Sequence, residues 1–344
     1  MTLAITNEDG LTVEQLPMLA PNGAGILQVV VKQGYRIEPG GRLVPLTEHP
    51  PIRYEDEYWG EEGESAIRYE TDAALSKPFT DLLVVGHAVA PGERPAREVQ
   101  VGLSYGGRVL RRLIVTGDRH WYDRGVGWSM TSPVPFVRMP LSYDLAFGGL
   151  DEGGHEARNT VGRGYASRLG DGFQGAFAPN IEHVDDRVRS PRDRPAPAGM
   201  GVLARNWAPR LGWAGTYDAA WQDERYPLLP TDFDMRFNHS AHPDQWLRSP
   251  RQGDRISISG MHAERVLSFE LPDPIMHAGF FFTKRPCDKR HMHLSAVVVD
   301  TDESRLELCW TATVDVHGDP FQLLETVVSR RPVTPRLAAD CGCS

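Results

Sequence analysis

The sequence predicts a mainly β protein, in which antiparallel sheets form a sandwich-like body that supports a long irregular central region with few short helices. Two observations carry this prediction. Apolar or alternating runs of strand length gather in the first and last thirds of the chain. The 344 residues also include 34 glycines and 27 prolines, an enrichment that favours turns and irregular connections over long helices.

The first third contains four runs that are typical of strands. Residues 26–35 (ILQVVVKQGY) and 81–89 (DLLVVGHAV) are rich in β-branched side chains and are followed by Pro- and Gly-containing turns. Residues 98–105 alternate apolar and polar side chains, and residues 108–116 return after Gly106-Gly107. Two such runs joined by two glycines predict a β-hairpin.

The last third returns to strand-like patterns, separated by turn residues. The expected strands are residues 255–259, 266–271, 279–283, 293–299 and 307–314, and residues 321–328 form either a strand or a short helix. We expect a main domain over residues 1–270, with a loop-rich centre at 121–247. Residues 271–330 add C-terminal strands, to that domain or beside it, and residues 331–344 form a flexible tail.

Charge and cysteine usage restrict the class of partner and the compartment. The formal net charge is -9, and an acidic chain repels the phosphate backbone of nucleic acids. No run approaches the roughly 18 apolar residues of a membrane-spanning helix. The N-terminal MTLAITNEDG lacks the pattern of a signal peptide, and no cysteine precedes Cys287. We therefore expect a cytoplasmic protein with no nucleic-acid or membrane partner.

The central region shows little periodicity but many Gly, Pro, Trp, Asn and Asp residues. Its order must come from side-chain hydrogen bonds to the backbone and from aromatic packing. Thr216 is placed to cap a short helix over residues 217–225, and residues 230–232 are placed to open another turn. A long irregular stretch inside a compact protein is usually functional or disordered, and its many aromatic residues argue against disorder.

Several short motifs in this region follow one another in a specific order. Residues 140–149 read PLSYDLAFGG, residues 161–165 VGRGY, residues 215–218 GTYD and residues 227–234 PLLPTDFD. Over about residues 25–265 this order resembles the domain of unknown function 2169 family, which is encoded beside bacterial type VI secretion genes. The resemblance implies a non-enzymatic adaptor or chaperone that binds an effector through its PAAR-like domain and helps load it onto the VgrG-type spike. It implies no catalytic residues and no cofactor.

Polar and aromatic residues of these motifs are the candidate site. Polar groups need partners when they are buried, and arginines are suited to bidentate pairing with carboxylates. Two interpretations stay open: a polar network that pins the loops, or a recognition surface with Trp207, Trp213, Trp221 and Phe233 as contact residues. The full set is Arg119, Asp144, Asn159, Arg163, Glu182, Trp207, Arg210, Trp213, Asp218, Trp221, Asp232, Phe233, Asp234, Asn238 and Gln245.

Two further hypotheses concern acidic residues. Asp232 and Asp234, with Glu182 and Asp218, can be imagined as paired carboxylates for glycoside hydrolysis, which makes a hydrolytic enzyme the alternative function. The acidic stretch at residues 48–72 also holds aromatic residues such as Tyr54, and forms either a solvated loop or a partner-binding edge.

A metal site is a separate hypothesis. His291 and His293 begin a predicted strand, on which positions i and i+2 point the same way and can chelate. Cys287 lies before this pair, and Cys341 and Cys343 lie near the C-terminus. The cysteine spacing matches no standard zinc pattern, so no metal is assigned.

Overall fold

The computed structural model describes residues 4–316 and 322–333, apart from the side chain of Asp171. It confirms a mainly β protein, with several sheets in which most strand pairs are antiparallel. Among the described residues the one α-helix is α1 (Ala219–Glu224), which has six residues. No helix of these residues has the length and apolar character needed to cross a membrane.

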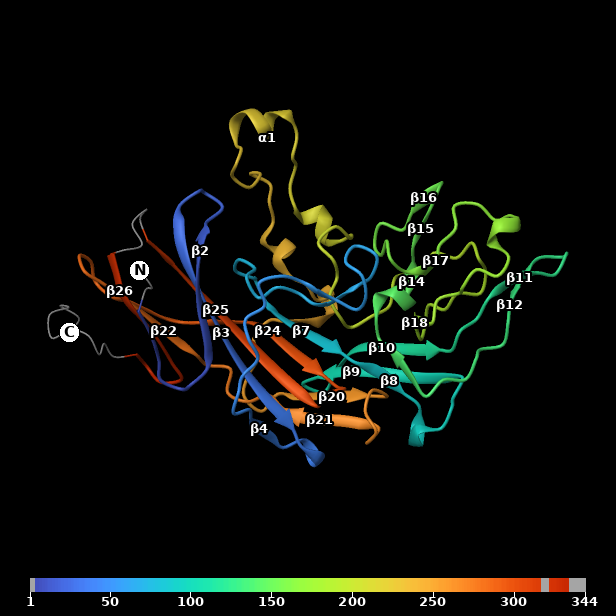
Figure 1. Ribbon diagram of the computed structural model, residues 1–344, viewed down its shortest axis with the longest axis horizontal. Coiled ribbons are helices and arrows are strands. Elements are labelled where there is room, and N and C mark those ends of the chain that lie inside the picture. The colour runs from blue at the N-terminus through green and yellow to red at the C-terminus, as the bar shows by residue number, and fades with distance from the viewer. Residues whose placement is uncertain (1–3, 317–321, 334–344) are drawn as a thin grey trace.

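The largest sheet has seven strands and combines segments from both ends of the chain (Figure 1). Its order is β19 (Trp246–Leu247), β7 (Thr80–Val85), β24 (His293–Asp300), β25 (Arg305–Asp315), β3 (Gly25–Ile37) and β2 (Thr12–Leu19), with β4 (Leu43–Pro45) on the end of β3. The β7–β24 pair is parallel and the other pairs are antiparallel. Residues 293–315 thus supply the centre of a sheet whose flanking strands β7, β3 and β2 come from the first third.

A five-stranded sheet faces part of the first one. Its order is β18 (Ile181–His183), β10 (Arg108–Thr116), β9 (Glu98–Tyr105), β20 (Arg255–Ser259) and β21 (Val266–Glu270). The β9–β10 hairpin has the predicted bounds. Its two turn residues, Gly106 and Gly107, have φ values of 56° and 80°. Both lie in the left-handed region, which glycine adopts without steric cost.

A four-stranded sheet lies at the end of the molecule where both described termini are found (Figure 1). Its order is β1 (Ala4–Asn7), β26 (Leu323–Ser329), β22 (His277–Phe282) and β23 (Asp288–His291). Of the two structures left open for residues 321–328, the strand is the one found from Leu323 onward, and Phe321 lies outside the described residues.

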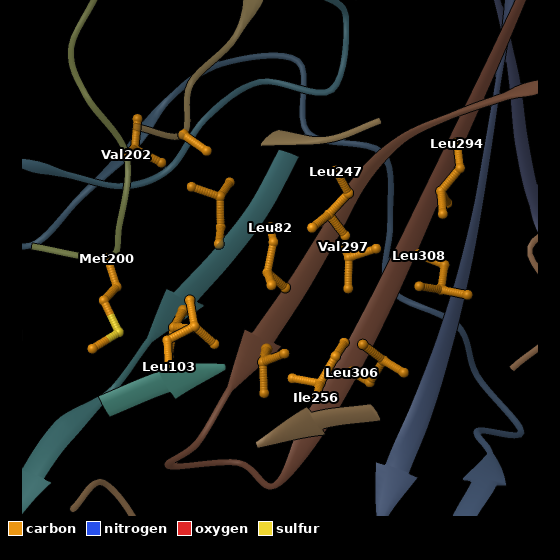
Figure 2. Close-up of a cluster of buried hydrophobic side chains, with 14 of the residues drawn as sticks. Leu82, Leu103, Met200, Val202, Leu247, Ile256, Leu294, Val297, Leu306 and Leu308 are labelled. Atoms are coloured by element: carbon orange, nitrogen blue, oxygen red, sulfur yellow. The ribbon is translucent and has the colours of Figure 1, made fainter. Parts of the chain in front are cut away.

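The core lies between the seven- and five-stranded sheets. Figure 2 shows Leu82 and Val297 of the first sheet pointing toward Leu103 and Ile256 of the second, and all four are at most 1% exposed. Burying one such side chain contributes about 1.5–3 kcal/mol. The alternation read from residues 98–105 therefore gives the inward face of β9, as predicted.

One predicted strand is interrupted. Residues 81–89 were expected to be continuous, but β7 ends at Val85 and β8 (His87–Val89) begins two residues later. Gly86 between them has a φ of 139°, and a Cβ there would lie 2.1 Å from the hydroxyl oxygen of Thr301. This close approach lets β8 leave the seven-stranded sheet and pair with β13 (Arg138–Pro140).

The central region forms short ladders, single 3₁₀ turns and loops. A second, smaller core beneath it contains Trp121, Phe147 and Phe173. The remaining short strands are β5 (Glu57–Tyr58), β6 (Ile67–Tyr69), β11 (Trp121–Asp123), β12 (Trp128–Met130), β14 (Phe147–Gly148), β15 (Leu150–Asp151), β16 (Gly154–His155) and β17 (Arg163–Gly164). The 3₁₀ turns are η1 (Pro39–Gly41), η2 (Pro91–Glu93), η3 (Tyr143–Leu145), η4 (Asp171–Phe173), η5 (Arg210–Trp213), η6 (Met235–Asn238) and η7 (Pro243–Gln245).

Candidate functional site

Residues 211–237 project from the body as an arm that carries α1 at its far end (Figure 1). Its two legs are joined side by side. The backbone N–H and the hydroxyl of Thr216 donate to the carboxylate of Asp232 at 3.0 and 2.8 Å, and the N–H of Asp234 donates to the carbonyl of Trp213 at 3.0 Å. Gly215 has a φ of 84°, and a Cβ there would lie 2.9 Å from Asp232. The close approach of the legs therefore requires glycine.

The tip of the arm is an aromatic cluster built around α1. The indole N–H of Trp221 donates to the carbonyl of Leu228 at 2.8 Å, which fixes the ring. The rings of Tyr217 and Tyr226 lie 4.7 and 5.7 Å from that of Trp221, centroid to centroid. Tyr217 is 52% exposed and Tyr226 is 69% exposed. We call Tyr217, Trp221 and Tyr226 the tip cluster.

The helix cap differs from the one predicted. Asp218, not Thr216, caps α1, because its carboxylate accepts the N–H of Trp221 at 2.9 Å. Thr216 instead bonds Asp232 across the legs. The turn predicted at residues 230–232 is present, with the N–H of Phe233 donating to the carbonyl of Pro230 at 3.1 Å.

The tip also contacts the turn between β2 and β3. The guanidinium of Arg225 donates to the carbonyl of Leu229 at 2.8 Å and to that of Pro21 at 3.2 Å. Leu228 sits against Gly23, where a Cβ would lie 2.8 Å from a methyl of Leu228. The arm is therefore held at its far end as well as at its base.

Arg210 holds the base of the arm. It is 1% exposed, and it donates to the carboxylate of Glu70 at 2.7 Å. It also donates to the carbonyl of Leu203 at 2.6 Å and to that of Phe237 at 3.1 Å. The buried guanidinium of Arg210 thus joins three segments: the start of the arm, its end at Phe237, and the loop after β6 that carries Glu70.

The four proposed contact residues fall into two groups. Trp213, Trp221 and Phe233 of the arm are half-buried. The ring of Trp213 lies 5.6 Å from that of Trp246 in β19, and the ring of Phe233 lies 5.6 Å from that of Phe237 in the arm. Trp207 is 2% exposed, and its indole N–H donates to the hydroxyl of Thr160. Trp207 therefore belongs to the core and does not form part of a surface.

The other arginine candidates pair as expected for a polar network. Arg119 donates to Glu182 at 2.7 Å, and both side chains are buried. Arg163 donates to the amide oxygen of Asn180 at 2.8 Å. The first contact attaches β18 to the segment around residue 119, and the second attaches β17 to the residue that precedes β18.

The remaining candidates bond backbone groups. Asn159 donates to the carbonyls of Tyr143 and Phe147, and Asp144 accepts the N–H of Ala66 at 3.0 Å. Asn238 donates to the carbonyl of Ser76 at 3.0 Å, and Gln245 donates to that of Leu82 at 2.7 Å. Each of these side chains joins a loop to another segment of the chain. This arrangement fits the first interpretation, a polar network that pins the loops.

Sequence reasoning missed a buried cluster centred on Asp81, which is 0% exposed. Its carboxylate accepts from Lys77 at 2.7 Å, from Nδ1 of His239 at 2.7 Å and from the N–H of Ser240 at 2.9 Å. Nε2 of His239 accepts the N–H of Phe79 at 3.3 Å. Neither ring nitrogen is therefore free to act as a general base, and the Asp81–His239 pair is structural.

The electrostatics of this cluster follow from its cations. Burial by itself would raise the pKa of Asp81, but the charge of Lys77 and the hydrogen bond from His239 outweigh burial and hold that pKa well below its usual range. Lys77 and Asp81 lie four residues apart in the segment KPFTD, which is a weak signal of their pairing, but nothing local indicated His239 as the partner.

A second missed cluster lies on the seven-stranded sheet. Lys32 is buried between Asp72 at 2.8 Å and Glu307 at 3.3 Å, and Arg53 donates to Glu307 at 2.8 Å. Burial opposes ionisation of Glu307, yet the hydrogen bond from Arg53 and the charge of Lys32 lower its pKa to about 2. This cluster pins the acidic stretch at residues 48–72 to β3 and β25.

The carboxylates of the hydrolase hypothesis have separate structural partners. Glu182 is buried against Arg119 in the body, whereas Asp218 and Asp232 line a recess of about 430 Å³ on the arm. Hydrogen bonds from Thr216 lower the pKa of Asp232, and those from Arg236 lower the pKa of Asp234. A glycosidase needs one carboxyl with a raised pKa as its acid. The arrangement expected for that hypothesis, with Glu182 facing Asp232 or Asp234, is not found.

The expected histidine pair is also divided. His291 ends β23 and His293 begins β24, so they do not lie two apart on one strand. His293 bonds the carbonyl of Phe79, whereas His291 lies beside His277. Within residues 4–316 and 322–333, no three His, Cys, Asp or Glu side chains are grouped to hold a metal ion. Cys341 and Cys343 lie outside the described residues.

Residues 22–311 match the sequence model of a family described as an uncharacterized protein conserved in bacteria, DUF2169. The chain belongs to this family. The DUF2169 match includes the arm, its base and the strands β24 and most of β25, which extends it beyond the span of about residues 25–265 read from the motifs. No curated protein and no solved structure matches this DUF2169 chain.

Stability should fall as the pH is lowered from 6.5 toward 4, and His242 should account for part of the loss. Burial and the nearby charge of Arg111 lower the pKa of His242 from 6.5 to about 4, although Asp244 opposes the shift. Between these values the unfolded chain binds more protons, so the contribution is complete above pH 6.5 and is lost as the pH falls through 4. Chemical denaturation over this range should give a shallower pH slope for His242→Gln than for wild type, and an unchanged slope for the exposed control His155→Gln. Equal slopes in all three proteins would contradict the assignment.

Proposed function

We propose that this protein is an adaptor that binds another protein through the tip cluster of the arm. The observation that carries the proposal is a rigid group of three aromatic rings, two of them more than half exposed, at the end of a projecting element. Tyr and Trp are enriched among the residues that dominate protein interfaces. Rings already fixed in place lose little conformational entropy on binding.

The rest of the arm fits a binding role. Asp232, Arg225 and Arg210 make bonds that hold the arm in one geometry, from its legs and tip to its base. Binding residues commonly lie on irregular segments that a β scaffold positions. In this proposal the candidate polar residues act indirectly, because they position the surface without contacting the partner.

The proposed cargo is a type VI secretion effector, bound through its PAAR-like domain. Membership of the DUF2169 family and the resemblance carried by the motifs support this choice. The adaptor would act stoichiometrically in the cytoplasm, keep the effector soluble and help to load it onto the VgrG-type spike. It needs no cofactor for this role, and no nucleic acid or membrane takes part.

Replacing both exposed tip tyrosines, Tyr217→Ala with Tyr226→Ala, is expected to weaken cargo binding at least about tenfold, since interface aromatics typically contribute 1–2 kcal/mol or more each. Both side chains lie at the surface, so the thermal midpoint should change little. Tyr54→Ala is the matched control, because Tyr54 is 61% exposed but lies on the body. Affinity is measured with purified cargo, which a pull-down from the native bacterium followed by mass spectrometry identifies.

The outcomes separate the parts of the proposal. Failure to recover a PAAR-like effector from cells that express one would overturn the adaptor function. Recovery of the effector with unchanged affinity for the tip variant would remove the arm from the interface. If Tyr54→Ala weakened binding instead, the acidic stretch at residues 48–72 would be the binding edge.

A further inference from the structure

Two histidines face each other across the β22–β23 pair, at the edge of the four-stranded sheet. His277 and His291 are direct partners in this antiparallel ladder. The N–H of Met292 donates to the carbonyl of Met276 at 2.8 Å, which makes the adjacent 276/292 pair a hydrogen-bonded one. Hydrogen-bonded and non-hydrogen-bonded pairs alternate, so 277/291 is of the second kind, in which facing side chains approach most closely. Their ring centroids are 4.5 Å apart, with an interplanar angle of 44°.

The nitrogens of these two rings are available to a ligand. Neither ring shows a hydrogen-bond partner among the described residues, whereas His87, His239 and His293 each have one. His291 is exposed and His277 is half-buried, so solvent reaches the pair. The carboxylate of Asp273 interacts electrostatically with His277 and adds a negative charge that suits a cation.

We propose that His277 and His291 form a two-histidine site for a divalent first-row transition metal cation, which bridges β22 and the edge strand β23. Imidazole is a preferred ligand of zinc, nickel and copper. No third protein ligand is grouped with the pair in the described ranges, so the other coordination positions belong to water or to an added ligand. Chelation arises because binding to one ring makes capture by the second intramolecular. The site is independent of the tip cluster and of the adaptor function.

The test is titration of untagged full-length protein with Zn²⁺ and with Ni²⁺ by calorimetry, and by thermal unfolding in parallel. We expect one equivalent of cation to bind and the thermal midpoint to rise with cation concentration, because a ligand of the folded state stabilises it. His277→Asn and His291→Asn should each weaken binding by about tenfold or more, since each removes the second arm of the chelate. Mg²⁺, which prefers oxygen ligands, should have no effect on the midpoint.

His155→Asn is the matched control, because His155 is exposed and lies on β16 in the central region. It should bind the cation with wild-type affinity. Loss of binding in only one of the two variants would show a single surface imidazole instead of a bridge. Wild-type binding in both variants, or no binding by the wild-type protein, would overturn the proposal.

Discussion

Arg210→Met is expected to lower the free energy of unfolding by about 3–5 kcal/mol, the cost of removing one partner from a buried ion pair. Methionine keeps much of the apolar volume but leaves Glu70 in the interior with Arg205, at 3.1 Å, as its remaining ion-pair partner. The carbonyls of Leu203 and Phe237 also lose their donor. Because Arg210 joins both ends of the arm to the body, limited proteolysis should cut the arm faster in this variant. Denaturant unfolding measures the first effect and protease digestion the second.

Arg255→Met provides the control for this prediction. Arg255 makes a 3.0 Å ion pair with Glu270, and both side chains are well exposed. Surface pairs of this kind contribute about 0–1 kcal/mol, so the control should unfold like wild type. Equal stability of Arg210→Met and Arg255→Met would show that the buried contacts at the base of the arm do not hold it.

Asp81→Asn is expected to destabilise the protein by a similar amount, about 3–5 kcal/mol. The amide matches the carboxylate in shape but leaves the buried cation of Lys77 without its counter-charge, and its NH₂ group faces donors on His239 or Ser240. The difference in free energy of unfolding between Asp81→Asn and wild type should be largest at neutral pH. The folded-state pKa of Asp81 is lowered, so its contribution is complete above the unfolded value of 3.8 and is lost as the pH falls below it.

The matched control is Asp185→Asn, at a carboxylate whose side chain is 84% exposed and lies 4.0 Å from Arg112. Its free energy of unfolding should stay within about 0.5 kcal/mol of wild type. Denaturant unfolding at pH 7 and at pH 3 compares all three proteins. A difference between Asp81→Asn and wild type that is the same at both pH values would argue against an ionised Asp81.

The strands were predictable where the signal is local. The hairpin around Gly106-Gly107 and the strand at residues 255–259 have the predicted bounds, because alternation and turn chemistry are written in neighbouring residues. The break at Gly86 was not predictable. It depends on Thr301, which lies more than two hundred residues away in the chain.

The types of residue in the candidate site were predictable, but most of the residues that they pair with were not. Arg119 and Glu182 were both among the candidate polar residues, for which a polar network was one of two open interpretations, and they are paired. The partner of Arg210 is Glu70, 140 residues earlier, and that of Asp81 is His239, 158 residues later. Such pairs depend on which distant segments the fold brings together. Local patterns in a single sequence do not indicate those long-range contacts. For the same reason Trp207 looked like Trp213 in the sequence but lies in the core.

The placement of β24 and β25 has a consequence during synthesis of the chain. These strands fill the centre of the seven-stranded sheet between β7 and β3. Until residues 293–315 emerge from the ribosome, β3 with β2 and β4 is separate from β7 with β19, and β3 and β7 each have one unpaired edge. Pairings of such long sequence separation form slowly, and unpaired edges promote aggregation. Most of the polypeptide must therefore be translated before its main sheet can close, and expression of fragments ending before residue 293 should yield insoluble protein.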